Sequence, residues 1–459
     1  MKGKDLRALG IPQNFHKGLL KTIGEQIDAG RLADEVYDEL KSLAEAPETY
    51  TGDTFAELAE RLPKVQRWIE RDQPASWQQW GEDLEATAIS QMEHAVRLPI
   101  AYRGALMADA HMGYGLPIGG VLATEGAVIP YAVGVDIACR VKLSVLDIDV
   151  DTFENHPERF ENAIERETRF GIGAHFKSRH NHDVMDEDWE VSPITSRSKS
   201  KGWKQLGSSG SGNHFVEFGT LTLSEPDLGL EPGRYLALLS HSGSRGTGAA
   251  VANHYSKLAM KLRPHLPSEL RHLAWLDLAS EEGQEYWAAM ELMGRYASAN
   301  HAVIHRQILR NLGAEALAQV ENHHNYAWKE VHDGQKLIVH RKGATPAGKG
   351  VLGVIPDSMA DPGFVVRGKG NALSLESAAH GAGRVMSRTR AKKTMDWAPV
   401  KERLARQKVH LLSAGLDEVP DVYKNIEDVM RAQSDLVEIV ARFDPRMVKM
   451  APPGERAED

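Results

Sequence analysis

The sequence contains almost no cysteine. Cys139 is the single cysteine among 459 residues, so no disulfide can form within the chain, and this composition favours a reducing compartment. No apolar run is long enough to act as a signal peptide or to cross a membrane, because the longest, residues 113–138, is interrupted by prolines and acidic residues. We therefore expect a soluble, cytoplasmic protein that makes no membrane contact and whose cysteine is free for chemistry.

The chain also lacks a strong excess of positive charge. Its formal net charge is -9 and its isoelectric point about 6.1, so the molecule as a whole does not attract polyphosphates. Any binding of nucleic acid must therefore come from a local basic surface. Hydrophobic residues make up 42% and charged residues 26% of the chain, a balance that is typical of a folded globular protein.

The length of the chain and its pattern of apolar residues and glycine predict its domain organisation. A chain of 459 residues exceeds what one hydrophobic core usually supports, so we expect one large domain and a smaller part. Apolar residues follow helical spacing up to about residue 95, and beyond it short apolar runs alternate with glycine. The prediction is an α+β protein with a helical N-terminal segment (1–95), a single large mixed-sheet catalytic domain (96–451) and a flexible tail (452–459).

Several elements can be placed within this domain. The clearest long helix covers residues 280–311, and residues 140–150 predict a strand whose alternation shifts phase, as at a β-bulge. Residues 181–205, acidic and then rich in serine, lysine and arginine, predict a surface loop. Further strands are predicted at 214–223, 234–240, 335–340, 351–355 and 363–367.

Six short segments place a candidate metal or phosphate ligand beside glycine, which lets the backbone approach a bound group closely. They begin at Asp109, Gly134, Gly210, His241, His323 and His380. Taken singly, a cysteine near glycine is more often a small buried apolar residue than a ligand, and a lone histidine is more often a hydrogen-bonded surface residue. Their joint occurrence, together with Asp136, supplies the donor types of a transition-metal site.

Two other segments could bind anions. Residues 236–254 predict a strand, a Gly-rich turn and a helix start that suits a phosphate, although an ordinary strand-to-helix turn has the same pattern. Residues 380–393 add arginines and lysines to another Gly-rich turn, which fits phosphate recognition and equally a solvated basic helix end. His301 and His305 stand four apart on the long helix, but no glutamate follows the first, so packing is the preferred interpretation.

Together these segments resemble the RtcB family of RNA-splicing ligases, in order from about residue 97 to residue 449. The motifs are Gly-Val-Asp-Ile-x-Cys, Gly-x-Gly-Asn-His-Phe, His-x-Gly-Ser-Arg-Gly, His-His-Asn, Arg-Lys-Gly-Ala-Thr and His-Gly-Ala-Gly-Arg-x-Met-Ser-Arg. They stand here at 134–139, 210–215, 241–246, 323–325, 341–345 and 380–388. The likeness implies the fold of an RtcB catalytic domain and an RNA ligase activity.

The resemblance also implies roles for single residues. Asp136, Cys139 and His214 would hold one manganese ion, and Cys139, His241 and His324 a second, with the thiolate bridging the two. His380 would take GMP from GTP, and the further catalytic residues implied are Asp109, Arg245 and Arg384, with Arg179 and the Ser-Lys-rich stretch 196–204 as additional candidates for gripping RNA phosphates. The implied nucleotide contacts are Asn213, His214, Phe215, Val216, Glu217, His324, Asn325, Pro356, Asp357, Ser358, Met359, Gly381, Ala382, Gly383 and Lys449.

The implied reaction joins a 3'-phosphate or 2',3'-cyclic phosphate end to a 5'-hydroxyl end through a guanylylated 3' end, in tRNA splicing or RNA repair. The partners implied are GTP, RNA ends, DNA 3'-phosphate ends as a further option, and an activating protein. Three alternatives stay open: a two-metal phosphoesterase without nucleotidyl-histidine, a 3'-end capping enzyme that ligates poorly, and an RNA-end or nucleotide sensor. One departure from the family pattern, Arg140 beside Cys139, predicts an altered hold on the terminal phosphate.

Overall fold

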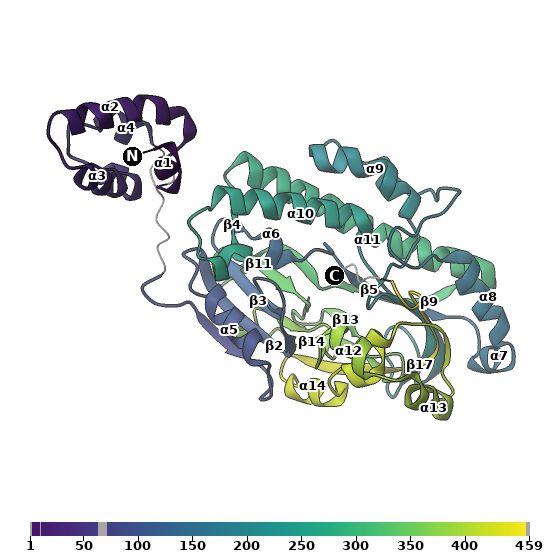
Figure 1. Ribbon diagram of the computed structural model, residues 1–459. Coiled ribbons are helices and arrows are strands. Elements are labelled where there is room, and N and C mark those ends of the chain that lie inside the picture. The colour runs from purple at the N-terminus through teal and green to yellow at the C-terminus, as the bar shows by residue number, and fades with distance from the viewer. Residues whose placement is uncertain (1, 10, 63–70, 456–459) are drawn as a thin grey trace. The chain divides into compact units, whose positions relative to one another are not determined.

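The computed structural model describes residues 2–9, 11–62 and 71–455, and it divides into two compact units, Met1–Ile69 and Glu70–Asp459. Within the described residues, no helix combines the length and the apolar character that crossing a membrane requires. Figure 1 shows the elements of both units.

The N-terminal unit is helical, as its apolar spacing predicts. Residues such as Leu19, Ile23, Val36 and Leu40 recur at helical spacing and form one small buried core. The described helices are α1 (Gly3–Ala8), α2 (His16–Asp28), α3 (Ala33–Glu45) and α4 (Ala56–Arg61), with short 3-10 turns at Gln13–Phe15 and Pro47–Thr49.

The helical segment was predicted to run to residue 95, but the division between the units falls earlier, after Ile69. Strand β1 (Ser76–Gln79) pairs in parallel with β2 (Ala101–His111), so it belongs to a sheet of the larger unit. Helix α5 (Ala86–Ala95) buries Ala88 and Met92 against β2. Helix α5 is buried by strands that follow it in the chain, and the apolar spacing of a helix does not show which element buries it. Helical periodicity alone therefore placed the boundary too late.

Two sheets form the frame of the larger unit. The first has the order β1-β2-β3-β11-β10, and the second β13-β14-β17-β6-β7-β5-β9 with β16 paired to β17. The strands of the first sheet not yet given are β3 (Ile118–Thr124), β10 (Asn325–His332) and β11 (Gln335–Lys342). Those of the second are β5 (Arg140–Leu146), β6 (Phe215–Leu223), β7 (Gly233–Ser242), β9 (Ala316–His323), β13 (Leu352–Ile355), β14 (Gly363–Gly368), β16 (His410–Ser413) and β17 (Val437–Met450). Two short pairs complete the set: β4 (Ala127–Val128) with β8 (Leu276–Asp277), and β12 (Ala344–Pro346) with β15 (Ser377–Ala379).

Helices cover both faces of the second sheet. Ile304 and Ile308 of α11 (Glu281–Leu312) pack with Phe160 of α8 (Pro157–Glu167) against Phe218 on one face. The other face packs against Ala391 of α12 (Arg388–Thr394) and Leu404 of α13 (Trp397–Gln407). Helix α10 (Arg245–Leu262) lies beside α11 (Figure 1). The remaining helices of this unit are α6 (Pro130–Val133), α7 (Val150–Asn155), α9 (Pro193–Gln205) and α14 (Ile426–Ala432).

Most predicted elements are confirmed to within two residues at each end. They are the strands β6, β7, β11, β13 and β14 and the long helix α11. Two predictions are wrong, one only in its extent. The strand predicted at 140–150 has the expected register shift, which lies between Val145 and Leu146 against β9, but it ends at Leu146 and a helix begins at Val150. The predicted loop at 181–205 contains helix α9, which a capping box between Ser192 and Thr195 and a proline at its first position initiate.

Candidate active site

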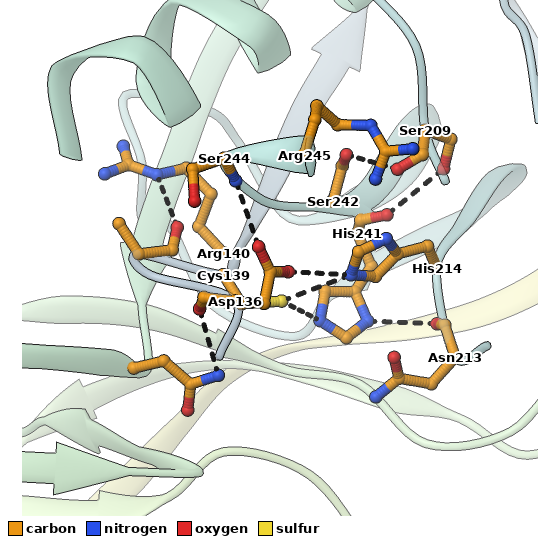
Figure 2. Close-up of polar contacts among 12 residues, drawn as sticks. Asp136, Cys139, Arg140, Ser209, Asn213, His214, His241, Ser242, Ser244 and Arg245 are labelled. Atoms are coloured by element: carbon orange, nitrogen blue, oxygen red, sulfur yellow. Dashed lines mark hydrogen bonds and ion pairs between the residues drawn. The ribbon is translucent and has the colours of Figure 1, made fainter. Parts of the chain in front are cut away.

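Four side chains from three separate segments of the sequence meet at the ends of β5, β6 and β7. The Sγ atom of Cys139 lies 3.1 Å from Nε2 of His241 and 3.5 Å from Nε2 of His214. The same nitrogen of His214 lies 3.1 Å from Oδ2 of Asp136, and Figure 2 shows all four side chains pointing at one another. His324 extends this cluster, because its Nε2 lies 3.2 Å from Nε2 of His241. All five predicted metal ligands are therefore brought together.

Strand pairing explains this convergence. Strand β5 lies between β7 and β9 and pairs Val141 with His241 and Arg140 with His323, so His241 and His324 flank the start of β5. The turn before β5 carries the cysteine inward because Ala138 adopts a left-handed conformation, with φ of 57°. That turn is fixed by backbone bonds, in which Ala138 donates to Asn325 and His324 donates to Cys139.

The protonation states suit a metal ion. Burial lowers the pKa of His241 and of His324 well below the usual value, so both rings stay neutral at pH 7. The Nδ1 atom of His241 lies 3.1 Å from the carbonyl of Asn213, so Nδ1 carries the proton and Nε2 offers its lone pair to the cluster. Burial raises the pKa of Asp136, but the hydrogen bonds and charges of its neighbours, chiefly His214 and Arg245, together outweigh burial and leave this pKa below normal. A carboxylate, neutral imidazoles and one thiol form a donor set that fits a transition metal.

His380 lies beside this cluster. Its ring centroid is 4.8 Å from that of His324, and its Nδ1 lies 2.6 Å from Oδ2 of Asp109. The same carboxylate oxygen accepts a hydrogen bond from the backbone N–H of His380. Asp109 is fully buried, whereas 15% of the His380 side chain is exposed. The carboxylate thus holds the proton on Nδ1, and the other ring nitrogen, Nε2, keeps a free lone pair.

A cavity of about 390 Å³ opens over the cluster and His380. Its acidic lining residues are partly neutral, because burial raises the pKa of Glu217 well above its usual value and that of Asp357 to about 8. The predicted site residues that line it are Asp136, Cys139, Asn213, His214, Phe215, Glu217, His241, His324, Asn325, Pro356, Asp357, Ser358, Met359, His380, Gly381, Ala382, Gly383 and Arg384.

Three predicted site residues lie away from this cavity, besides Asp109 behind His380. Val216 is fully buried in the core between the second sheet and α11. Val448 and Met450 line the cavity, so strand alternation places Lys449 on the opposite face, where it pairs with Glu165. Arg245 is 2% exposed and donates to Oγ of Ser208 at 3.1 Å.

The remaining arginines are engaged within the protein. Arg384 donates to the carbonyl of Asp417 at 2.7 Å while its side chain lines the cavity. Arg179 lies with its guanidinium 4.9 Å from the ring of Trp203 and is not among the cavity-lining residues. The expectation that Arg140 alters the hold on a phosphate is not supported, because its guanidinium pairs with Glu321 and turns away from the cluster.

The sequence interpretation missed several polar and aromatic residues of this cavity. Lys342 belongs to the Arg-Lys-Gly-Ala-Thr motif, and burial lowers its pKa to about 7. His111, in the segment that begins at Asp109, also lines the cavity, and burial lowers its pKa to about 4. Tyr114 and Tyr131 had no signal beyond nearness to glycine and proline, so only the structure shows that they belong to this cavity.

Comparison with known proteins identifies the family of this chain. The family model described as tRNA-splicing ligase RtcB matches residues 91–450. The chain belongs to the RtcB family. The predicted resemblance and the predicted α+β fold of an RtcB catalytic domain are thereby confirmed.

Relatives in the RtcB family are similar over most of the chain. The RNA-splicing ligase RtcB of Escherichia coli strain K12 is 34% identical over 392 residues, covering 78% of this chain and 93% of that protein. The RNA-splicing ligase RtcB1 of another Escherichia coli strain is 33% identical over 392 residues, with the same coverage. The tRNA-splicing ligase RtcB of Nanoarchaeum equitans is 31% identical over 437 residues, covering 79% of this chain and 91% of that protein. The N-terminal unit lies outside the residues that the RtcB model matches.

Proposed function

We propose that this protein joins RNA ends, a 3'-phosphate or 2',3'-cyclic phosphate to a 5'-hydroxyl, through a GMP adduct on His380. The observation that carries the proposal is the contact between His380 and Asp109 at the edge of the Cys-His cluster. In the neutral ring this contact holds the proton on Nδ1 and leaves the lone pair on Nε2, beside a cavity, which is the arrangement that a nucleophilic histidine needs. The names of the RtcB relatives, RNA-splicing and tRNA-splicing ligases, support RNA as the substrate.

A 2',3'-cyclic phosphate is first opened by water, which breaks the bond from phosphorus to the 2'-oxygen and gives a 3'-phosphate and a 2'-hydroxyl. Three displacements at phosphorus follow. Nε2 of His380 attacks the α-phosphorus of GTP, a P–N bond forms and pyrophosphate leaves. An oxygen of the RNA 3'-phosphate then attacks the same phosphorus, which breaks the P–N bond and gives an RNA that ends in a pyrophosphate-linked guanosine. The 5'-hydroxyl finally attacks the RNA phosphate, its proton is lost and GMP leaves. The prior transfer of GMP is needed because the oxygens of an unactivated 3'-phosphate are poor leaving groups.

The residues of the site suit these steps. Phosphorylation of Nε2 makes the imidazole ring cationic, and the buried carboxylate of Asp109 compensates this charge. The five cluster residues, Asp136, Cys139, His214, His241 and His324, would hold two divalent ions, for which we propose Mn²⁺. Bound metal would supply positive charge to the phosphate oxygens and to the leaving group.

Labelled GTP tests the proposal. The full chain is incubated with α-labelled GTP and Mn²⁺, and we expect an acid-labile, hydroxylamine-sensitive label on His380, which His380→Ala abolishes. Addition of an RNA with 3'-phosphate and 5'-hydroxyl ends should then release GMP and give a joined product. Hydrolysis of cyclic or terminal phosphates without any labelled protein would instead identify a two-metal phosphoesterase. Labelled RNA that accumulates without joining would identify a capping enzyme, and GTP binding without turnover a sensor.

A further inference from the structure

A cluster of three aromatic rings lies at one side of the catalytic cavity. Tyr114 follows β2, Tyr131 lies in α6, and His272 lies in the 3-10 turn Ser268–Leu273. Their ring centroids are 6.3 Å apart for Tyr114 and Tyr131, 5.8 Å for Tyr114 and His272, and 4.7 Å for Tyr131 and His272. We call these three rings the aromatic platform.

The most exposed ring of the platform faces open space in the cavity. Tyr114 is 66% exposed and lines the cavity together with Tyr131. The planes of Tyr131 and His272 meet that of Tyr114 at 65° and 70°, so neither neighbour stacks flat on it. An exposed aromatic ring that borders the cavity offers a flat apolar face to a ligand.

The backbone that carries Tyr114 is held firmly. The carbonyl of Tyr114 accepts a hydrogen bond from Nζ of Lys342 at 2.7 Å. The amide of Gln91 bonds the N–H of Gly113 at 3.0 Å and its carbonyl at 2.6 Å. Gly115 has a φ of 72°, and a Cβ there would lie 2.9 Å from the carbonyl oxygen of His272. The ring is therefore presented by a fixed turn, which lowers the entropic cost of placing a flat ligand on it.

The platform lies on a different wall of the cavity from the predicted nucleotide contacts of β6 and of the segment after β13. Phe215 and Glu217 come from β6, and residues 356–359 follow β13, both strands of the second sheet. The platform is attached to the first sheet, since Tyr114 follows β2 and is bonded to Lys342 of β11. The segment of His380 approaches both walls: a Cβ on Gly343 would lie 3.1 Å from Cε1 of His380, and a Cβ on Gly381 would lie 3.2 Å from the carbonyl oxygen of Pro356.

From this arrangement we infer that the aromatic platform stacks an unpaired base of the RNA strand next to the reacting end. The inference rests on the proposed function for the identity of the strand. Stacking on tyrosine is a general mode of binding for single-stranded RNA and tolerates any base. The Nζ atom of Lys342 lies beside the platform, 5.5 Å from the ring of Tyr131. This assignment gives RNA a contact that the internally engaged Arg245 and Arg384 do not provide.

Binding of a short RNA to the full chain tests the inference. The probe is a labelled single-stranded RNA with a 3'-phosphate, measured by fluorescence anisotropy with Mn²⁺ and without GTP. We expect Tyr114→Ala and Tyr114→Leu to weaken binding about 5- to 150-fold, the factor that loss of one stacked base gives. Tyr114→Phe keeps the ring and should bind within about threefold of the parent chain. The matched control is Leu373→Ala, which removes a side chain of similar exposure, 57%, that does not line the cavity.

A second probe and a second readout decide whether the stacked base belongs to the RNA or to GTP. An RNA without a base at the terminal nucleotide should bind the parent chain weakly and lose little more with Tyr114→Ala. Labelling of His380 by GTP should change less than twofold in Tyr114→Ala. Unchanged RNA binding in Tyr114→Ala, or a loss of GTP labelling as large as the loss of RNA binding, would overturn the inference. If the parent chain takes no label from GTP, the proposed function fails, and the anisotropy measurement still decides whether the platform binds a base.

Discussion

Asp109 and His380, 271 residues apart in the chain, meet through one carboxylate oxygen. Oδ2 of Asp109 lies 2.6 Å from the ring Nδ1 and 3.2 Å from the backbone N–H of His380. The fully buried aspartate therefore fixes both the backbone position and the tautomer of the histidine. Gly383 packs directly against the backbone of Asp109, since a Cβ at position 383 would collide with the carbonyl of Asp109.

Asp109→Asn should disable His380 while leaving the fold intact. An asparagine that donates from its amide would make Nδ1 an acceptor, and the proton would move to Nε2, where it blocks the attack on GTP. We expect the rate of GTP labelling to fall at least about 100-fold, as for loss of other partners that orient a histidine. Rapid-quench labelling measures the rate. Asp333→Asn, at a surface aspartate that is 47% exposed, is the control. Labelling by Asp109→Asn at the parent rate would show that the carboxylate has no orienting role.

Cys139→Ala should abolish binding of the metal pair. Cys139 contacts both His214 and His241, so its thiolate is the common donor of the cluster. We expect the affinity for Mn²⁺, measured by isothermal titration calorimetry, to fall at least about 100-fold because a ligand is lost outright. The far-ultraviolet circular dichroism spectrum should not change. His175→Ala, at an exposed histidine away from the cluster, should bind Mn²⁺ as the parent does. Retention of two tightly bound ions by Cys139→Ala would refute the bridging role.

Gly243→Ala should disturb the same metal site by a steric clash, since the backbone at position 243 has a conformation that alanine can adopt. Gly243 does not have a positive φ, but an added Cβ would collide with both carboxylate oxygens of Asp136. Displacement of this ligand should weaken Mn²⁺ binding about 10- to 100-fold, the range seen when a ligand is misplaced. Gly24→Ala is the matched control, because a Cβ there meets no atom within 4 Å. Equal Mn²⁺ affinities for the two variants would mean that Asp136 does not bind the metal.

Acid should destabilise the protein through His340. Burial lowers the pKa of His340 to about 4, and both ring nitrogens are already used, Nε2 accepting from Ile129 and Nδ1 donating to Leu122. In the unfolded chain the pKa is about 6.5, so between pH 6.5 and 4 the unfolded state binds more protons and stability falls as the pH is lowered. This histidine alone should lower the free energy of unfolding by about 2 kcal/mol from pH 7 to pH 5.

The measurement is urea unfolding of the parent chain and of His340→Gln at several pH values. The variant cannot titrate in this range, so its free energy of unfolding should fall less steeply with acid, whatever its stability at pH 7. His175→Ala, which removes an exposed histidine, should keep the parent slope. Parallel slopes for the parent and His340→Gln would contradict a neutral, buried His340 as a source of acid sensitivity.

Local patterns in the sequence were sufficient for much of the fold. Apolar periodicity and glycine placed α11 and strands such as β6 and β7 to within two residues. The same patterns failed where one local sequence pattern is compatible with two kinds of secondary structure. The phase shift after Val145 coincides with the predicted register shift against β9, but the strand ends at Leu146 and a helix begins at Val150, so the apolar residues beyond Leu146 do not extend the strand. The polar stretch before Gln205 forms a helix because Ser192 and Pro193 initiate it.

The candidate site likewise has features that the sequence predicts and features that only the structure shows. The sequence by itself determined which donors exist and in what order, because residue types such as Cys139 and His380 and their glycine neighbours are local facts. Only the tertiary structure decided which of them meet. Pairing of β5 with β7 and β9 brings His241 and His324 to Cys139, and strand alternation turns Lys449 away. The physical reason is that periodicity specifies the faces of an element, whereas contacts between distant elements depend on how those faces pack.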